Sequence, residues 1–277
     1  MLASLLTGAK RILRTELDDL QQKGRRIRYQ PSLAVTNATD STILDALETT
    51  GSYVTTLDAL GIPGSAEMLR AADALYASLG DRPPGKGGFL ITATAAEIER
   101  HPALLLWGLH ERLLAIVENY ISQPLDYRGL VARRDIVGGD QTETRLWHRD
   151  QEDLRIVKII VYVNDVDRGK LATWRLGSNI GRIDDQLMMQ LVPQSFQHVT
   201  SGPRGTVVFT DTCSVFHRGT IAHTADRRAL FYCYNSKSPR RPHNCEPMFD
   251  RNAFALKQPG LTAAQRTAIS LTRATEH

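Results

Sequence analysis

The sequence of 277 residues has few cysteines and no long apolar run. Its three cysteines, Cys213, Cys233 and Cys245, are an odd number and form no CxxC motif. This excludes a disulfide framework and favours a reducing, cytoplasmic compartment. No apolar stretch approaches the roughly 20 residues that are needed to cross a bilayer, so we expect no membrane span.

The N-terminal segment lacks the features of a secretory signal, because its apolar part is short and its charges follow that part. Three acidic residues in the same segment argue against an organelle transit peptide. The apolar residues instead recur at helical spacing. They predict an amphipathic helix on Leu2, Leu5, Leu6, Ile12, Leu13, Leu17 and Leu20.

No charge of one sign dominates, since 34 Lys and Arg face 30 Asp and Glu and the formal net charge is only +4. The densest basic stretch is KSPRRPH at 237–243, which is a single short segment. Nucleic-acid binding requires a longer stripe of positive charge. We therefore predict a solvated loop at 237–243 and no nucleic-acid partner.

The sequence contains no internal repeat and no low-complexity segment, and its pattern changes once, from helical to strand-like. The first part is mostly helical, with predicted helices at 41–50 (capped by Ser41), at 65–79 and at 94–121, the last interrupted at Pro102. Beyond residue 124, short β-branched and aromatic runs alternate with turn residues. Seven strands are predicted, within 127–139, 142–148, 155–166, 170–178, 196–202, 205–212 and 227–236.

Short strands at this spacing are typical of an antiparallel sandwich or barrel. The predicted fold is mainly β with α (α+β): a double-stranded β-helix, that is a jelly roll or cupin-like barrel, with the helical N-terminal portion packed on it. No linker separates the parts, so we expect one domain over 1–277. It divides into helical support (about 1–123), a jelly-roll core (about 124–236) and a C-terminal loop and tail (237–277).

The stretch LWHRD contains two potential metal ligands, His148 and Asp150, with one residue between them. Alternate residues of a strand point to the same face, so both side chains are expected on one side of the barrel. The spacing is weak evidence alone, because a polar pair at a strand end has the same pattern. A third ligand is offered by His217 in the later stretch VFHRG, and His198 is the competing candidate.

Two arginines open the otherwise apolar strand RRALFYCYNS. Arg227 and Arg228 face opposite ways, so at most one points into the barrel, where an arginine requires an anion. A guanidinium binds a carboxylate through two parallel hydrogen bonds.

Two histidines and one carboxylate form the facial triad of non-haem Fe(II) oxygenases, which leaves positions open for a 2-oxo acid and then O2.

These motifs resemble the Fe(II)/2-oxoglutarate-dependent dioxygenases of the phytanoyl-CoA dioxygenase (PhyH-like) family. The resemblance runs from about 44 to 236 and is strongest in LWHRD, VYVNDVDRGKLATWRLGS, GTVVFTDTCSVFHRG and RRALFYCY. It implies Fe(II), 2-oxoglutarate and O2 as cofactors. The iron ligands then fall on His148, Asp150 and His217. The 2-oxoglutarate arginine falls on Arg227, with Ala229 two places on, in preference to Arg228. Tyr162 is implied as a further co-substrate residue, and Lys158 as a second candidate.

The sequence also departs from related patterns at informative positions. Asn179 replaces the histidine of the usual GSH segment, and Cys233 stands where nucleic-acid demethylases carry a second arginine. Asp150 fills the carboxylate position that halogenases leave open, so hydroxylation is expected before halogenation.

The expected function is therefore oxidation, by hydroxylation, of a C–H bond in a small molecule, with release of succinate and CO2. A cupin-like metal enzyme that uses no 2-oxoglutarate and a non-catalytic ligand-binding barrel are the alternatives. The substrate (an amino acid, an acyl chain or a biosynthetic intermediate), hydroxylation versus desaturation, and the oligomeric state are left open. Predicted rims of the site are 81–89, 141–145 and 236–244, and a substrate anion would meet Arg133, Arg134 or Arg218.

Overall fold

The computed structural model describes residues 23–35, 37–85, 87–140, 142–167, 170–172 and 197–270, together with Leu17, Leu20 and Gln21. Most of the predicted N-terminal helix, most of the predicted strand at 170–178, a possible helix at 182–191, Asn179 and the tail at 271–277 lie outside these residues. Within the described residues, no helix is both long enough and apolar enough to cross a membrane.

Helices dominate the first half of the described chain, as the sequence predicts. Asn37, and not Ser41, caps the helix predicted at 41–50: its side chain accepts a hydrogen bond from the Asp40 amide, so this helix begins earlier than expected. Pro102 begins a new helix, as the sequence predicts, because a proline is tolerated in a first turn. The helices are α2 (Ala38–Thr49), α3 (Leu57–Leu60), α4 (Ser65–Leu79), α5 (Ala95–Glu99), α6 (Pro102–Gly108), α7 (Glu111–Ile121), α9 (Arg251–Lys257) and α10 (Ala263–Ile269).

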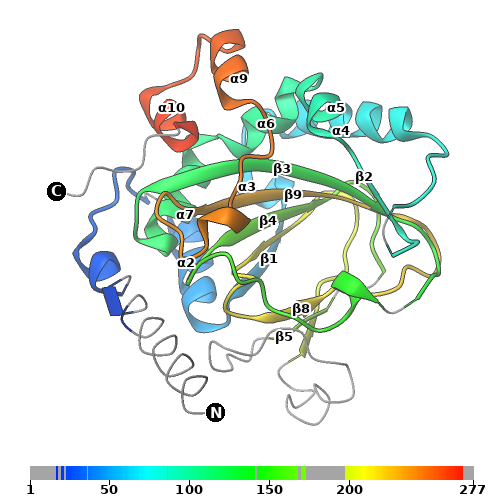
Figure 1. Ribbon diagram of the computed structural model, residues 1–277, viewed down its shortest axis with the longest axis horizontal. Coiled ribbons are helices and arrows are strands. Elements are labelled where there is room, and N and C mark those ends of the chain that lie inside the picture. Colours follow the sequence, from blue (N-terminus) through cyan, green and yellow to red (C-terminus); the bar gives the residue numbers. More distant parts are fainter. Residues whose placement is uncertain are drawn as a thin grey trace, which may run out of the picture.

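The described strands form two antiparallel sheets (Figure 1). The large sheet has the order β1-β7-β4-β9-β3-β2 and the small sheet the order β6-β5-β8. Their bounds are β1 (Ser52–Thr56), β2 (Leu90–Thr92), β3 (Leu125–Asp135), β4 (Val157–Tyr162), β5 (Lys170–Ala172), β6 (Gln197–Val199), β7 (Thr206–Thr210), β8 (Phe216–Arg218) and β9 (Arg227–Ser236). The helical half of the chain thus also contributes an edge strand at each side of the large sheet.

One predicted strand is not a strand. Residues Glu143–Arg145 form the 3₁₀ helix η1, and an extended segment follows that carries the HxD motif. This segment is held by a single bridge to β8, in which the His148 and His217 backbones exchange hydrogen bonds of 3.0 and 2.9 Å. The bridge therefore lengthens the small sheet by one short, irregular strand.

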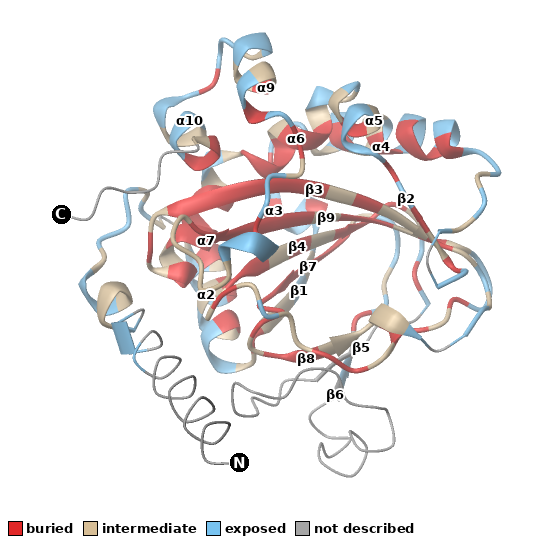
Figure 2. Cartoon of the chain, viewed as in Figure 1, coloured by how far each residue is buried: buried red, intermediate tan, exposed pale blue. Residues whose placement is uncertain are grey.

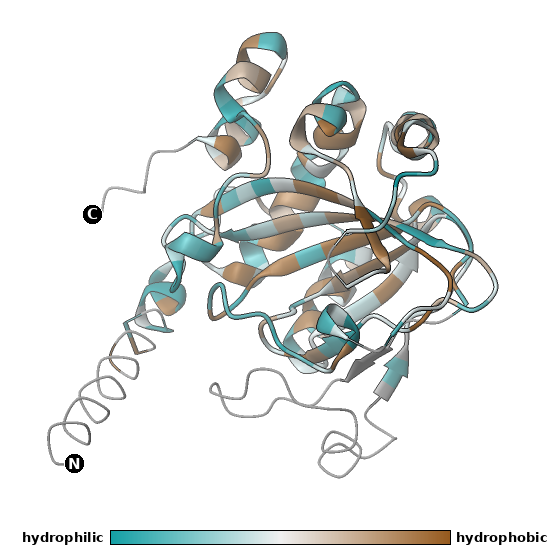
Figure 3. Cartoon of the chain, turned by 45° about the vertical axis from the view of Figure 1, so that its right-hand side comes forward, coloured by the Kyte–Doolittle hydropathy of each residue, from teal (hydrophilic) through white to brown (hydrophobic). Residues whose placement is uncertain are grey.

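Helices cover one face of the large sheet, and the small sheet lies over the other (Figure 1). The main core fills the space between helices and sheet, where alternate residues of β9 (Leu230, Tyr232 and Tyr234) meet Trp107 and Leu105. Figure 2 shows this burial along the strands and on the helix sides that face them. Figure 3 shows hydrophobic colour along the same strands. The residues between these on the strands point to the other face, toward the small sheet.

Candidate metal centre

Three side chains that the sequence predicts as ligands meet between the two sheets. His148 comes from the extended segment after η1, Asp150 follows it, and His217 comes from β8. One ligand atom from each lies within 4.8 Å of the other two, and the imidazole rings are 4.3 Å apart. His217 Nε2 is 3.7 Å from Asp150 Oδ2. The backbone bridge between the two histidines sets this proximity, because directly paired residues present neighbouring side chains.

The second nitrogen of each imidazole fixes the ring orientation. Nδ1 of His148 lies 2.7 Å from the Leu146 carbonyl oxygen, and Nδ1 of His217 lies 3.2 Å from the Val215 carbonyl oxygen. A carbonyl only accepts hydrogen bonds, so each Nδ1 carries a proton and Nε2 is the other nitrogen of each ring. Burial lowers the pKa of His217 to about 3, which keeps that ring neutral. His217 is thus in the neutral form that binds a metal, and the Nδ1 contact of His148 orients its ring in the same way.

Asp150 is held by its backbone and by its side chain. Its amide donates to the Thr212 carbonyl at 2.8 Å, and Lys158 Nζ donates to its Oδ2 at 2.5 Å. Burial alone would raise the pKa of Asp150, but the ammonium group of Lys158 outweighs burial and lowers it. The pKa of Lys158 is raised in turn, because Asp150 more than offsets the cost of burial. The structure therefore places Lys158 against the carboxylate of the His148–Asp150–His217 cluster.

The neighbouring candidates lie elsewhere. His198 is exposed on β6 and does not join the cluster. Asp153 is buried and accepts hydrogen bonds from Ser236 Oγ at 2.6 Å and from the Arg240 amide at 3.2 Å, so it anchors the 237–243 loop. Glu152 lies 3.9 Å from Lys158 Nζ. The loop at 237–243 thus packs beside the HxD segment.

The two arginines that open β9 face opposite ways, as expected. Arg227 lines the cavity that contains the His-Asp-His cluster and is largely buried, whereas Arg228 is directly opposite Arg134 and does not line the cavity. Arg227 Nε and Nη2 donate to Asp135 Oδ2 at 3.0 and 2.9 Å. Asp135 has no exposed surface, and although burial raises its pKa, Arg227 and Arg133 lower it overall. This carboxylate fixes the guanidinium of Arg227 at the cavity wall.

Tyr162 lies on the same face of β4 as Lys158, as the alternation of a strand predicts. Its hydroxyl donates to the Thr200 carbonyl at 2.5 Å and lies 3.2 Å from Thr200 Oγ1. The Tyr162 ring therefore forms a wall of the cavity while its hydroxyl binds the protein.

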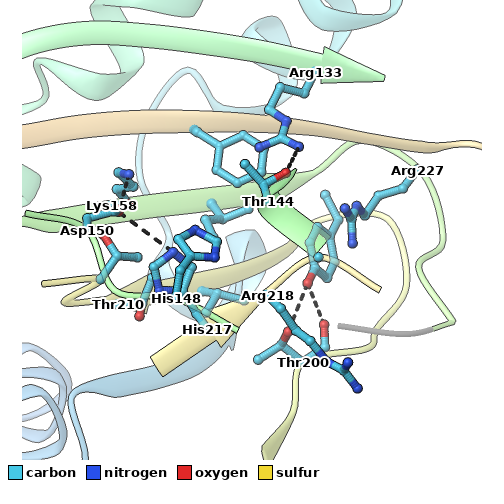
Figure 4. Close-up of a pocket in the computed structure, with 16 residues that line it drawn as sticks. Arg133, Thr144, His148, Asp150, Lys158, Thr200, Thr210, His217, Arg218 and Arg227 are labelled. Carbon is cyan, nitrogen blue, oxygen red and sulfur yellow. Dashed lines mark hydrogen bonds and ion pairs between the residues drawn. The ribbon is translucent and has the colours of Figure 1, made fainter. Parts of the chain in front are cut away.

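The cavity has a volume of about 150 Å³ and opens between the two sheets (Figure 4). Thr144, within the predicted rim 141–145, lines the cavity from η1, whereas sequence reasoning missed Asp135 behind Arg227. The signal that could have found Asp135 is the alternation Arg133-x-Asp135 at the end of β3, which places both side chains on one face. The cavity is lined by Arg133, Thr144, His148, Asp150, Lys158, Ile160, Tyr162, Thr200, Val208, Thr210, Thr212, His217, Arg218, Gly219, Arg227 and Phe231.

Comparison with family models and with curated protein sequences finds no match. Solved structures of Fe- and 2-oxoglutarate-dependent enzymes do match the fold. EctD from S. alaskensis with 2-oxoglutarate and 5-hydroxyectoine is 19% identical, with a TM-score of 0.53 over 77% of this chain and 85% of that chain. The epimerase SnoN in complex with Fe3+, alpha ketoglutarate and nogalamycin RO is 12% identical, with a TM-score of 0.51 over 72% and 84%. The mixed α+β fold is thus one that these enzymes share.

Proposed function

We propose that the protein is a non-haem Fe(II)- and 2-oxoglutarate-dependent dioxygenase that hydroxylates a C–H bond of a small molecule and releases succinate and CO2. The observation that carries this proposal is a two-histidine, one-aspartate cluster with a buried arginine in the same small cavity. The cluster alone fits several divalent metals, whereas an arginine on the cavity wall is the anchor that a dicarboxylic co-substrate needs.

The three ligands in this proposal are His148, Asp150 and His217. The donor set fits Fe(II), since the His217 ring is neutral, its Nε2 lies 3.7 Å from Asp150 Oδ2, and that carboxylate is ionised. A facial set of three ligands leaves room for 2-oxoglutarate and O2. The bound iron would supply the oxidative chemistry, and the surrounding apolar wall of Ile160, Val208 and Phe231 would exclude water.

Arg227 is the proposed anchor for the distal carboxylate of 2-oxoglutarate. Its Nε and Nη2 are used by Asp135, and Nη1 has no hydrogen-bond partner among the described residues. On β9, the side chains of Ala229 and then Phe231 follow Arg227 on the same face. This row runs toward the part of β9 that pairs with Lys158 of β4. The co-substrate would extend along this row, past the ring of Tyr162. Arg228 has no such access, and Lys158 would touch the metal end and not the distal carboxylate.

The finer assignments belong to the same proposal. The PhyH-like type rests on the motifs LWHRD, VFHRG and RRALFYCY, and the two facing sheets fit a double-stranded β-helix with 1–277 as one dioxygenase domain. The carboxylate of Asp150 favours hydroxylation over halogenation. The EctD structure contains 5-hydroxyectoine, a hydroxylated small molecule, whereas SnoN is an epimerase. The shared fold thus accommodates more than one type of reaction.

Anaerobic binding tests the proposal without knowledge of the substrate. Fe(II) and 2-oxoglutarate together should give a weak visible band near roughly 500 nm, from chelation of a 2-oxo acid at a facial triad. Arg227→Met should abolish the band at moderate co-substrate concentration, and the matched variant Arg228→Met should keep it. Iron binding without the band would favour a cupin-like enzyme that uses no 2-oxoglutarate. Absence of both iron binding and the visible band would favour a non-catalytic ligand-binding barrel.

A further inference from the structure

The wall of the cavity carries more positive charge than the proposed cofactors neutralise. Arg133 Nη2 donates to Asp135 Oδ1 at 3.1 Å, while Arg227 binds Oδ2 of the same carboxylate. One buried negative charge is therefore shared by two guanidiniums. A buried positive charge without a counter-ion is costly, so this wall requires a further anion.

The proposed co-substrate supplies only one of the missing charges. One carboxylate of 2-oxoglutarate lies at the metal, and the other is assigned to Arg227. Arg133 then remains on the cavity wall, and its only carboxylate partner among the described residues, Asp135, also binds Arg227. Among the described residues its Nε is buried without a hydrogen-bond partner, and its Nη2 reaches Thr144 Oγ1 at 3.3 Å. The guanidinium therefore has donors to spare beside a hydroxyl that accepts and donates.

Strand register places Arg133 between Arg227 and the metal end of the cavity. Arg133 is directly opposite Ala229, which is in turn opposite Tyr162, so it belongs to the next row after Asp135 and Arg227. Its guanidinium lies 5.2 Å from the centre of the Phe231 ring. Figure 4 shows Arg133 entering from β3 above Thr144, on the side opposite Arg218. This is a position beside the path of the co-substrate and not at its end.

The three arginines predicted to meet a substrate anion differ in where they point and in what they contact. Arg134, next to Arg133 on β3, faces the other way and binds Asp226 at 2.7 Å and the Gly80 carbonyl at 2.6 Å. Arg218 lines the cavity with its guanidinium 4.9 Å from the centre of the Trp147 ring. Arg133 alone combines a place on the cavity wall, a shared counter-ion and an adjacent hydroxyl from the HxD side.

We infer that the substrate oxidised at this centre carries an oxyanion, a carboxylate or a phosphate, and that Arg133 together with Thr144 binds it. This inference rests on the proposed function and names the substrate class for the same site. Two parallel hydrogen bonds from a guanidinium suit either oxyanion. Binding there orients the substrate from the β3 side, with its C–H bond toward the metal cluster.

The test uses full-length protein loaded with Ni(II) and 2-oxoglutarate, which cannot turn over. Ligand-observed NMR measures binding of benzoate, phenylacetate and phenyl phosphate against the neutral benzamide and phenylacetamide. The anions should bind at least about tenfold more tightly than the amides, as expected for a charge-assisted pair. Arg133→Met should remove this preference, and Arg134→Met, on the opposite face of the same strand, should keep it. The carboxylate and phosphate probes show which oxyanion is preferred.

Separate readouts distinguish the two ways to fail. If wild-type protein binds no Ni(II) or 2-oxoglutarate, the proposed function fails and the inference fails with it. If both bind but the anion preference is absent, or survives Arg133→Met, the inference alone is wrong. It is also wrong if Arg133→Met weakens 2-oxoglutarate as much as Arg227→Met does, since Arg133 would then serve the co-substrate. Arg133→Lys keeps the charge beside Asp135 and, should Arg133→Met not fold, must still lower the preference.

Discussion

The two faces of the large sheet have opposite chemistry although the same strands build them. On β4, Val157, Ile159 and Val161 pack against the helices with no exposed surface, while Lys158 and Tyr162 alternate with them toward the cavity. The helix side is a continuous apolar core. The cavity side has only a small apolar cluster among ionic groups. One face therefore supplies the stability with which the other holds buried charges in place.

The largest expected contrast is between two histidines of the small sheet. His217→Ala should reduce metal binding and 2-oxoglutarate turnover to background, because it removes one of three ligands. The control His198→Ala, exposed on β6, should leave both unchanged. Isothermal titration with Ni(II) and succinate assays measure the two quantities. Retained metal binding in His217→Ala would remove the basis of the proposed centre.

Adjacent isoleucines of β4 compare the faces directly. Ile159 has no exposed surface in the main core, whereas Ile160 is half-buried beside the cavity. Ile159→Ala should cost about 2–5 kcal/mol of unfolding free energy, as for other fully buried aliphatic residues. Ile160→Ala should cost about 1 kcal/mol, since it enlarges a cavity that already exists. Chemical denaturation of the metal-free protein gives both values. Equal losses would show that the cavity side carries as much of the stability as the core.

The pair of Lys158 and Asp150 links stability to the metal. Lys158→Met leaves the ionised Asp150 buried without its 2.5 Å partner, which should cost the metal-free protein about 1–3 kcal/mol. A bound divalent ion would replace that partner, so saturating Ni(II) should restore most of the loss. Thermal unfolding with and without Ni(II) measures the difference. If Ni(II) stabilises the variant no more than wild type, Asp150 does not face the metal.

The smallest expected effect is a difference in the pH dependence of stability between two fully buried aspartates, Asp135 and Asp211, one on each side of the large sheet. Arg227 and Arg133 lower the pKa of Asp135 against the effect of burial, whereas burial raises the pKa of Asp211, which accepts a 2.7 Å hydrogen bond from the Tyr120 hydroxyl. A lowered pKa stabilises the fold above the ordinary value of 3.8 and loses that effect in more acid solution. A raised pKa has the opposite sign, with stability lost as the pH rises.

Denaturation between about pH 3 and 7 therefore compares Asp135→Asn with Asp211→Asn across the range in which carboxyl groups titrate. Relative to wild type, Asp135→Asn should become less stable as the pH rises, and Asp211→Asn more stable. Parallel pH dependence of the two variants would contradict the opposite environments of these carboxyl groups.

Much of this division was readable in the sequence. Alternation on β4 places Lys158 and Tyr162 on one face, and alternation on β9 separates Arg227 from Arg228. The order of HxD, a later histidine and an arginine predicts which residues meet around one cavity. The structure brings those residues together, and the ligand and anchor roles remain proposals.

Other features depend on information that one sequence does not hold. The role of Asp135 follows from the pairing of β3 with β9, which joins segments distant along the chain. Residues 142–148 have strand-like composition, yet Thr144 reaches the cavity from a 3₁₀ turn, because Arg145 is held by the carbonyls of Gly138 and Asp140. Tertiary contacts of this kind override local propensity.

The backbone bridge between His148 and His217 has a consequence for the order in which the protein matures. The two histidines come from segments far apart in the chain and are brought together by two hydrogen bonds, not by a local motif such as neighbouring helix turns. Such long-range pairing is slow to form, and the unfolded chain offers no preassembled chelate. On the proposed function, we therefore predict that an ion would bind only once the two sheets have closed, so that metal uptake would follow folding and report its last step.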